Sequence, residues 1–380
     1  AAKETISIIR VTLPDVLIVI GGPHPSASEP ADLMGDFVDC DFAIRGEAEE
    51  SFPSLISEIK NSGVKDEKSA GGRYKKVPGL VWLEGGNVFS NPISFIHNLD
   101  DIDLPCWEMF NPKDYSVDMM GSTLKEGYTA PIITTRGCPG KCSFCCAYNI
   151  SGRKIRYRSP SNVLKEMSLL YNKYNVKKFM FMDNCFTSHK ENLMKICEGI
   201  IKEKMVIEWD FVSYEKLDNL TDSTLSLMYQ SGCRLIHMGI ESGSEKTRKV
   251  MNKSCSLKEV TDKIKVIQDN WINVGAWFMI GFPEETKKEI RETTNYAFSL
   301  DADLVTFTTC FPLPGSQVYH YIKDRYKFKK IDWAAFDIDK SAYPVSQLPS
   351  KELARQLRII RFKLLMGRVF KKITLNRKRK

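Results

Sequence analysis

One stretch of the sequence reads Arg136-Gly137-Cys138-Pro139-Gly140-Lys141-Cys142-Ser143-Phe144-Cys145, with three Cys in the spacing C-x3-C-x2-C. Thiolates are soft ligands that suit iron–sulfur clusters and zinc. A structural zinc site takes four ligands, usually as two C-x2-C pairs. The only nearby fourth thiol, Cys146, directly follows Cys145, and adjacent residues rarely reach the same metal. We therefore expect Cys138, Cys142 and Cys145 to hold a [4Fe–4S] cluster and to leave one iron open.

Around this stretch, apolar strand-like runs alternate with segments that have helical spacing. The runs begin near residue 130 and cover 131–135, 178–182, 207–213, 235–240, 274–280 and 304–309. Six successive βα units predict an α/β fold in which a parallel sheet curves into a partial (β/α)6 barrel. Six units are fewer than the eight of a closed barrel, so a lateral gap is expected. The Cys motif follows the first strand, where the loops of such folds carry active residues.

These residues resemble the radical SAM superfamily, in which a CxxxCxxC signature carries an aromatic residue before the last Cys. Phe144 occupies that aromatic position. The resemblance covers residues 130–320. It implies that S-adenosylmethionine (SAM) chelates the open iron and that the reduced cluster cleaves it to methionine and a 5′-deoxyadenosyl radical.

The same resemblance implies further SAM contacts at the strand ends. The backbone of Phe144 is expected near the adenine, and Asp183 near the SAM amino group, although relatives often carry a second acid where this chain has Asn184. Glu241, in a GxESGS-like segment, is expected at the ribose, and Ile280 at the adenine. A purely structural role stays open for Asp183 as an alternative to SAM binding, because Asp after a strand commonly forms a turn.

Other residues near these strand ends have ordinary interpretations as well. Glu284 and Glu285 fit the first turn of the following helix. Tyr214 stands where relatives often have Arg. We expect Arg248 to be a solvated helix charge, with a pairing to the SAM carboxylate as the alternative.

The N-terminal region predicts half of an open α/β sheet. Residues 16–20 form a short apolar run typical of a buried parallel strand. Residues 42–44 form a second run, and residues 52–60 have helical spacing. Because the chain starts at Ala1 with no preceding strands, we expect it to be N-terminally incomplete.

The turns of this region resemble the end of a cobalamin-binding domain, as found before the barrel in B12-dependent radical SAM proteins. The resemblance implies that Gly21, Gly22, Pro23 and Gly46 border the nucleotide tail of cobalamin, since backbone approaches a ligand closely at such turns. The sequence has no DxHxxG motif, and we expect His24 to support the loop and not to bind cobalt.

Four regions are therefore predicted: 1–62, the C-terminal part of a Rossmann-like cobalamin-binding domain; 63–128, a connector with a hairpin near 80–87; 129–320, the radical SAM partial barrel; and 321–380, a helical extension with a basic tail. In residues 351–370, apolar residues recur at helical spacing among Arg and Lys. We expect this helix to dock on the barrel. The alternative is a helix that lies on a membrane surface.

Composition narrows the class of protein. No apolar run approaches the roughly 20 residues that span a bilayer, and no secretory signal is present. Eleven Cys point to a reducing cytoplasm. The formal net charge is +8, and much of it lies in the last thirty residues. We expect this basic tail to be a solvated helix end.

The predicted function is radical SAM catalysis, with cobalamin-dependent methylation of an unactivated carbon as the leading reaction. The alternative within the class is oxidation or cyclisation of the anaerobic magnesium-protoporphyrin ester cyclase type. The alternative from another class is a zinc-stabilised nucleic-acid-binding protein. We expect a small-molecule or lipid substrate, an electron donor such as flavodoxin or ferredoxin, no nucleic-acid partner and, at most, peripheral membrane contact.

Overall fold

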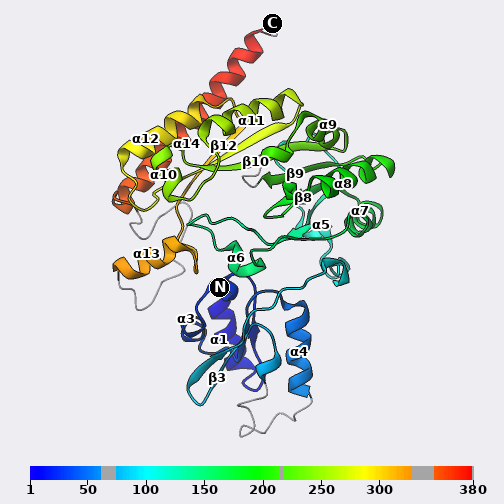
Figure 1. Ribbon diagram of the computed structural model, residues 1–380, viewed down its shortest axis with the longest axis vertical. Coiled ribbons are helices and arrows are strands. Elements are labelled where there is room, and N and C mark those ends of the chain that lie inside the picture. The colour runs from blue at the N-terminus through cyan, green and yellow to red at the C-terminus, as the bar shows by residue number, and fades with distance from the viewer. Residues whose placement is uncertain (61–73, 214–216, 327–345, 379–380) are drawn as a thin grey trace.

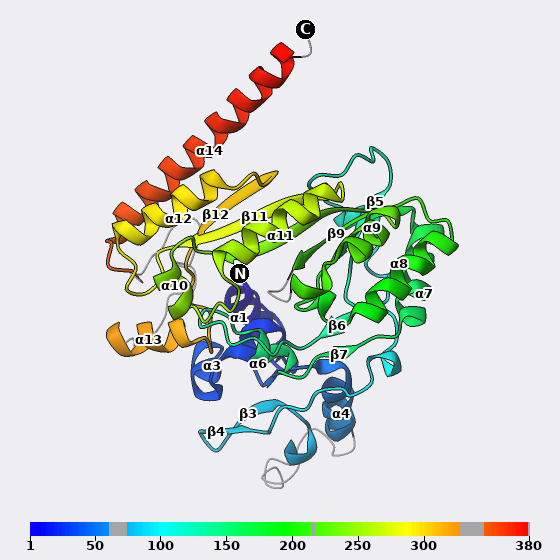
Figure 2. The same ribbon diagram turned by 45° about the horizontal axis from the view of Figure 1, so that its top comes forward.

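The computed structural model describes residues 1–60, 74–213, 217–326 and 346–378, with side chains described as far as Met366 in the last range. Its largest element is a six-stranded parallel sheet whose strands follow the order of the chain. The strands are β5 (Tyr128–Ile132), β8 (Val176–Phe181), β9 (Glu208–Ser213), β10 (Cys233–Glu241), β11 (Asn273–Ile280) and β12 (Leu304–Thr309). The predicted α/β fold with a partial (β/α)6 barrel is confirmed, and β5 and β12 are the two edges (Figure 2).

Helices connect these strands along the outer side of the sheet (Figure 2). They are α7 (Pro160–Tyr174), α8 (Lys190–Lys202), α9 (Asp222–Gln230), α10 (Glu245–Val250), α11 (Leu257–Asp269) and α12 (Lys287–Ser299). Their starts are encoded locally, since α11 and α12 begin with capping boxes at Ser256 and Thr286. The core between helices and sheet holds fully buried aromatic side chains, among them Phe179, Trp209 and Phe307.

The final helix, α14 (Ser350–Lys378), covers the β12 edge of the sheet. Leu353, Leu357 and Ile360 are each no more than 3% exposed and join the barrel core. Arg361 Nη2 donates a hydrogen bond to the Phe307 carbonyl of β12 over 2.9 Å. The expected docking is thus confirmed for the first part of α14, whereas its later turns extend away from the barrel (Figures 1 and 2). The short α13 (Gln317–Tyr326) precedes it.

A second, four-stranded sheet lies beneath the barrel, coloured blue to cyan in Figure 1. Its strands are β1 (Val19–Ile20), β2 (Phe42–Ile44), β3 (Leu80–Glu84) and β4 (Asn87–Ser90), flanked by α1 (Ala2–Thr12), α2 (Pro23–Ala27), α3 (Pro30–Asp36) and α4 (Ala48–Lys60). β1 pairs in parallel with β2, as the sequence predicts. The predicted hairpin forms β3 and β4, but β3 pairs with β2, so the hairpin belongs to this sheet and not to a separate connector.

The prediction of a buried strand over residues 16–20 is wrong in its extent. Only Val19 and Ile20 pair as a strand, and Val16 and Leu17 are 40% and 44% exposed. In the described residues β1 has one neighbour, β2, so it is an edge strand. The backbone before it pairs outside the sheet, because the Ile18 amide donates to Asp41 Oδ2 over 2.7 Å and the Val16 carbonyl accepts from Arg10 over 2.9 Å.

Short elements join the two sheets. A two-stranded ribbon pairs β6 (Thr135–Arg136) with β7 (Arg156–Tyr157), and α6 (Ala147–Ser151) between them packs on α2. The 3₁₀ turn Leu99–Asp101 and α5 (Pro112–Tyr115) lie between β4 and β5, whereas the 3₁₀ turns Phe186–Ser188 and Leu217–Asn219 follow β8 and β9 within the barrel. No helix within the described ranges is both long and apolar enough to cross a membrane.

Candidate active site

The three motif cysteines lie on a loop between β6 and α6, beyond the carboxyl end of β5. Cys138 is 9% exposed, and Cys142 and Cys145 are half-buried. Ser143 fixes the loop, because its amide donates to the Met251 carbonyl over 3.1 Å and its hydroxyl to the Val250 carbonyl over 2.9 Å. The loop is therefore held against the end of α10.

The motif thiols lie close enough to influence one another. Burial raises the pKa of Cys145, and the neighbouring Cys138 raises it further. Cys185, at the end of β8, is hydrogen-bonded to Cys138, and this contact and burial raise the pKa of Cys185. As the side chains stand, no group of three or more His, Cys, Asp or Glu in the described part of the chain is placed to hold a metal ion.

The chemistry of the donors nevertheless fits an iron–sulfur cluster. A cavity of about 580 Å³ opens beside Cys142 and Cys145 and is lined by four cationic side chains, those of Lys141, Arg153, Lys249 and Lys253. Positive charge favours thiolate over thiol, and three thiolates leave one iron open to a further ligand. The loop and cavity therefore suit a cluster with an adjoining ligand.

Asp183 is buried at the end of β8 and binds the loop that precedes the cysteines. Its Oδ1 accepts hydrogen bonds from the Thr134 amide (2.9 Å), the Thr134 hydroxyl (2.8 Å) and the Thr135 amide. Its Oδ2 is buried without a partner in the described residues. Burial raises the pKa of Asp183 to about 6. The turn-forming and ligand-binding interpretations are thus compatible, because one oxygen holds the loop and the other is left for a donor.

Glu241 ends β10 near the cysteine loop. Its backbone φ of 68° is left-handed, which is unusual for a residue other than Gly and is a form of strain that occurs at functional sites. Lys253 Nζ lies 3.8 Å from Glu241 Oε1, donates to the Gly239 carbonyl over 2.9 Å, and stands 5.7 Å from the centre of the Phe144 ring. Glu241, Phe144 and Cys145 therefore share one side of the site, with Lys253 among them.

The end of β11 is built from backbone turns and carboxylates. Ile280 is fully buried, and its carbonyl accepts a hydrogen bond from the Cys310 amide over 2.7 Å. Glu285 Oε2 accepts hydrogen bonds from the Gly281 amide (2.5 Å) and the Phe282 amide (3.2 Å). Burial raises the pKa of Glu285 to about 7. Glu285 thus shapes this turn, two residues before α12 begins.

Arg248 and His24 are both held by neighbouring residues. The expectation that Arg248 is a solvated helix charge is wrong, because the side chain is 2% exposed. It donates hydrogen bonds to the carbonyls of Ile240 and Cys255 and so stabilises the backbone next to Glu241. His24 packs edge-on against Phe37 at 5.9 Å between ring centres, consistent with a supporting role. Tyr214 lies outside the described residues.

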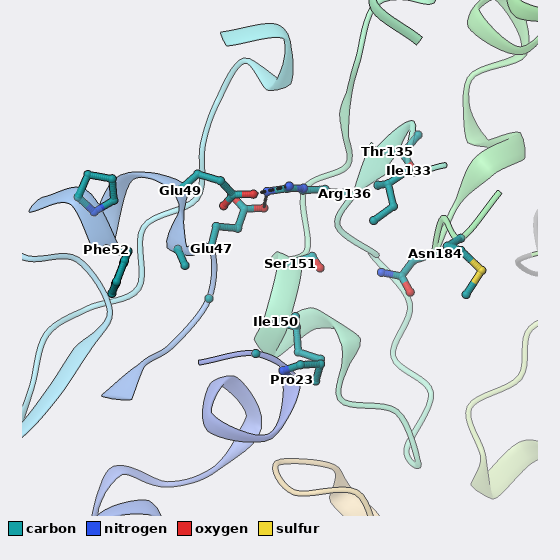
Figure 3. Close-up of a pocket in the computed structure, with 15 residues that line it drawn as sticks. Pro23, Glu47, Glu49, Phe52, Ile133, Thr135, Arg136, Ile150, Ser151 and Asn184 are labelled. Carbon is teal, nitrogen blue, oxygen red and sulfur yellow. Dashed lines mark hydrogen bonds and ion pairs between the residues drawn. The ribbon is translucent and has the colours of Figure 1, made fainter. Parts of the chain in front are cut away.

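A larger cavity of about 880 Å³ separates the N-terminal sheet from the barrel (Figure 3). Gly22, Pro23 and Gly46 line it from the N-terminal side, whereas Gly21 does not. Thr135, the first residue of β6, and Asn184, three residues after β8, line it from the barrel side. The structure thus brings three of the four residues expected at cobalamin to a cavity that borders the cysteine loop.

Ion pairs, one of them buried, hold the two sides of this cavity together, and the sequence interpretation missed them. Glu47 receives two hydrogen bonds from Arg156, 2.7 and 2.8 Å long, and both side chains are 6% exposed. Arg136 lies 3.4 Å from Glu47 and 2.5 Å from Glu49, and Figure 3 shows these side chains converging at the cavity wall. The only sequence signal was the acidic run after Gly46 and the Arg before the motif.

Comparison with known families agrees with this geometry. Residues 132–297 match the model of the radical SAM superfamily. The protein has a radical SAM domain. The matched segment starts in β5 and ends in α12, so it contains the cysteine loop, Asp183, Glu241 and Ile280.

Curated relatives of the radical SAM domain protein include both methyltransferases and cyclases. An uncharacterized methyltransferase of Pyrococcus horikoshii is 27% identical over 90% of this chain and 71% of its own length. The anaerobic magnesium-protoporphyrin IX monomethyl ester cyclase of Cereibacter sphaeroides is 25% identical over 93% of this chain. This chain spans only 55% of the cyclase.

Solved structures share the fold. The radical SAM methyltransferase TsrM of Kitasatospora setae, solved with cobalamin and a [4Fe–4S] cluster, matches 85% of this chain and 62% of its own with a TM-score of 0.65 and 16% identity. OxsB, a cobalamin-dependent radical SAM enzyme, matches 91% of this chain and 48% of its own with a TM-score of 0.64 and 17% identity. The match in both cases extends beyond the barrel.

Proposed function

We propose that the protein is a cobalamin-dependent radical SAM enzyme that methylates an unactivated carbon. The observation that carries this proposal is the cavity of about 880 Å³ between the Gly22 and Gly46 turns and the barrel mouth. Its far wall contains Thr135 and Arg136, two residues before Cys138. A flat ligand in this cavity would therefore lie next to the cluster loop.

The roles of individual residues follow from their positions. Cys138, Cys142 and Cys145 would hold the cluster, and Asp183, Glu241, Phe144 and Ile280 would surround SAM. Gly22, Pro23 and Gly46 would border cobalamin. The bound cofactors supply the radical and the methyl group. The chain's own contribution is to orient them and to exclude water, through the buried walls made by β8, β10 and β11.

Cobalamin binding and methyl transfer test this proposal separately. The reconstituted protein should retain cobalamin on gel filtration and, with reductant, transfer label from methyl-labelled SAM to a substrate found in an extract. Ser151→Trp should fill the cavity and lower cobalamin retention by about tenfold. Ser223→Trp, on the exposed surface of α9, should leave it unchanged. Equal retention in both variants would place cobalamin elsewhere.

A second candidate, radical oxidation or cyclisation, is favoured by the cyclase relative. In this case the enzyme would release 5′-deoxyadenosine without placing a labelled methyl group in the product. The presence or absence of the labelled methyl group in the product therefore distinguishes methylation from oxidation or cyclisation.

We also propose a cytoplasmic location and a flavodoxin or ferredoxin as electron donor. All eleven Cys lie in the described residues and none is in a disulfide, which supports a reducing compartment. Reduction of the purified protein by flavodoxin, followed by the loss of visible absorbance, would test the donor.

A further inference from the structure

Helix α14 carries two apolar stripes on opposite faces. Leu353, Leu357 and Ile360 are buried in the barrel core. Ile359, Phe362, Leu365 and Met366 are instead 38%, 63%, 58% and 36% exposed. These four residues recur at i, i+3, i+6 and i+7, the spacing of one helix face. We call them the outer stripe.

The backbone of α14 continues beyond the outer stripe and extends from the barrel (Figures 1 and 2). The sequence places apolar residues at the same spacing at positions 369, 370 and 373. The outer stripe itself favours a covering surface, because exposure of apolar side chains to water is unfavourable by roughly 25 cal/mol per Å².

Charge identifies the kind of surface. Residues 350–380 contain twelve Lys or Arg and one acidic residue, Glu352, whereas the whole chain has a net charge of +8. The remainder of the chain is therefore slightly acidic, and the positive charge is concentrated on this helix. Glu352 is itself paired with Arg355 at 2.9 Å.

We propose that the outer stripe of α14 docks on an anionic lipid surface. Helices with apolar and basic faces lie in the plane of the bilayer, with apolar side chains among the acyl chains and Lys or Arg at the headgroups. A nucleic-acid partner would neutralise the charge but leave Phe362 and Leu365 exposed to water. A lipid surface matches both the charge and the apolar side chains.

The geometry gives the docked orientation. Because the core-facing and outer stripes lie on opposite sides, α14 can contact lipid while Leu353 and Leu357 remain in the barrel core. The sheet edge at β12 would then face the membrane, and the cavity between the two sheets would lie on the distant side of the barrel (Figure 1).

Co-sedimentation of the full chain with vesicles tests the proposal. Binding is expected with vesicles of phosphatidylcholine containing about 30% phosphatidylglycerol, and at least about tenfold weaker binding with phosphatidylcholine alone. Phe362→Asp combined with Leu365→Asp should reduce binding to the anionic vesicles by about tenfold or more. Phe298→Asp, a matched change at a 43% exposed position on α12, should leave binding unchanged.

Further variants test the charge and the competing partners. Arg358→Gln with Lys363→Gln should weaken binding to anionic vesicles and reduce its salt dependence. All variants should unfold at the wild-type temperature, because none of the altered side chains is buried in the core. Binding to RNA in place of vesicles, or self-association that the double Asp variant abolishes, would overturn the proposal. So would equal binding of wild type and double Asp variant to vesicles.

Discussion

At the residue scale, the three motif cysteines differ from their neighbour Cys146. Cys146 is buried, burial raises its pKa to about 11, and it stands at the start of α6. We predict that Cys138→Ala, Cys142→Ala and Cys145→Ala each abolish the cluster, because a thiolate ligand is lost. Cys146→Ala should retain it. Iron and sulfide analysis after anaerobic reconstitution is the measurement, and a full cluster in Cys142→Ala would contradict the ligand set.

Asp183 and Glu241 allow ligand binding to be separated from stability. Each substitution to Ala should weaken SAM binding by about 10- to 100-fold, because a hydrogen bond to a charged or polar ligand is lost. Asp183→Ala should in addition lower the free energy of unfolding, by roughly 1–3 kcal/mol, because the Thr134 and Thr135 amides lose their acceptor. Calorimetric SAM titration and urea unfolding measure the two effects. Unchanged SAM affinity in both variants would remove these residues from the site.

Glu285 predicts a pH dependence of stability. Its folded-state pKa of about 7 lies above the ordinary value of 4.5, so the native state binds the proton more tightly than the unfolded state. The contribution of the protonated Glu285 carboxyl to the free energy of unfolding is therefore fully present below about pH 4.5. It is lost as the pH rises through about 7, by roughly 3 kcal/mol in total. Glu285→Gln should flatten this loss in urea unfolding measured from about pH 5 to about pH 8. Parallel pH profiles of the two proteins would refute the assignment.

At the element scale, α14 has a docked part and an extended part. Removal of residues 350–380 should lower solubility and the melting temperature, because the β12 edge and the core around Leu353 and Leu357 become exposed. Removal of residues 367–380 alone should leave the melting temperature unchanged. Thermal unfolding of the two truncated proteins distinguishes the parts, and equal stability of the longer truncation and wild type would show that docking contributes nothing.

At the scale of the whole molecule, the Glu47–Arg156 pair joins the N-terminal sheet to the barrel. Glu47→Gln should lower the free energy of unfolding by roughly 3–5 kcal/mol, because the buried Arg156 charge loses its carboxylate. Glu49→Gln is the matched control, since the Glu49 side chain is 37% exposed and its pairing with Arg136 is worth about 0–1 kcal/mol. Urea unfolding gives both values. Similar losses in the two variants would mean that burial of the pair is unimportant.

The local features of this protein can be predicted from its amino-acid sequence. The six strand–helix units were readable because apolar periodicity and capping residues such as Ser256 and Thr286 act within a few residues. The motif C-x3-C-x2-C and the glycine turns at Gly22 and Gly46 were equally local. Strand boundaries were less accurate: the first barrel strand was expected at 131–135, whereas β5 is Tyr128–Ile132, because its start depends on pairing with β8.

Contacts between residues that are distant in the chain could not be predicted from local sequence patterns, because they depend on how the elements pack. The 80–87 hairpin pairs with β2, and Glu47 contacts Arg156, although these residues are far apart in the chain. Arg248 is buried because of the residues that cover it. The same holds for the two faces of α14, since which apolar stripe is buried depends on the position of β12. Periodicity shows that a residue lies on an apolar face of a helix. Burial is set by the neighbouring element, and that neighbour is placed by the fold.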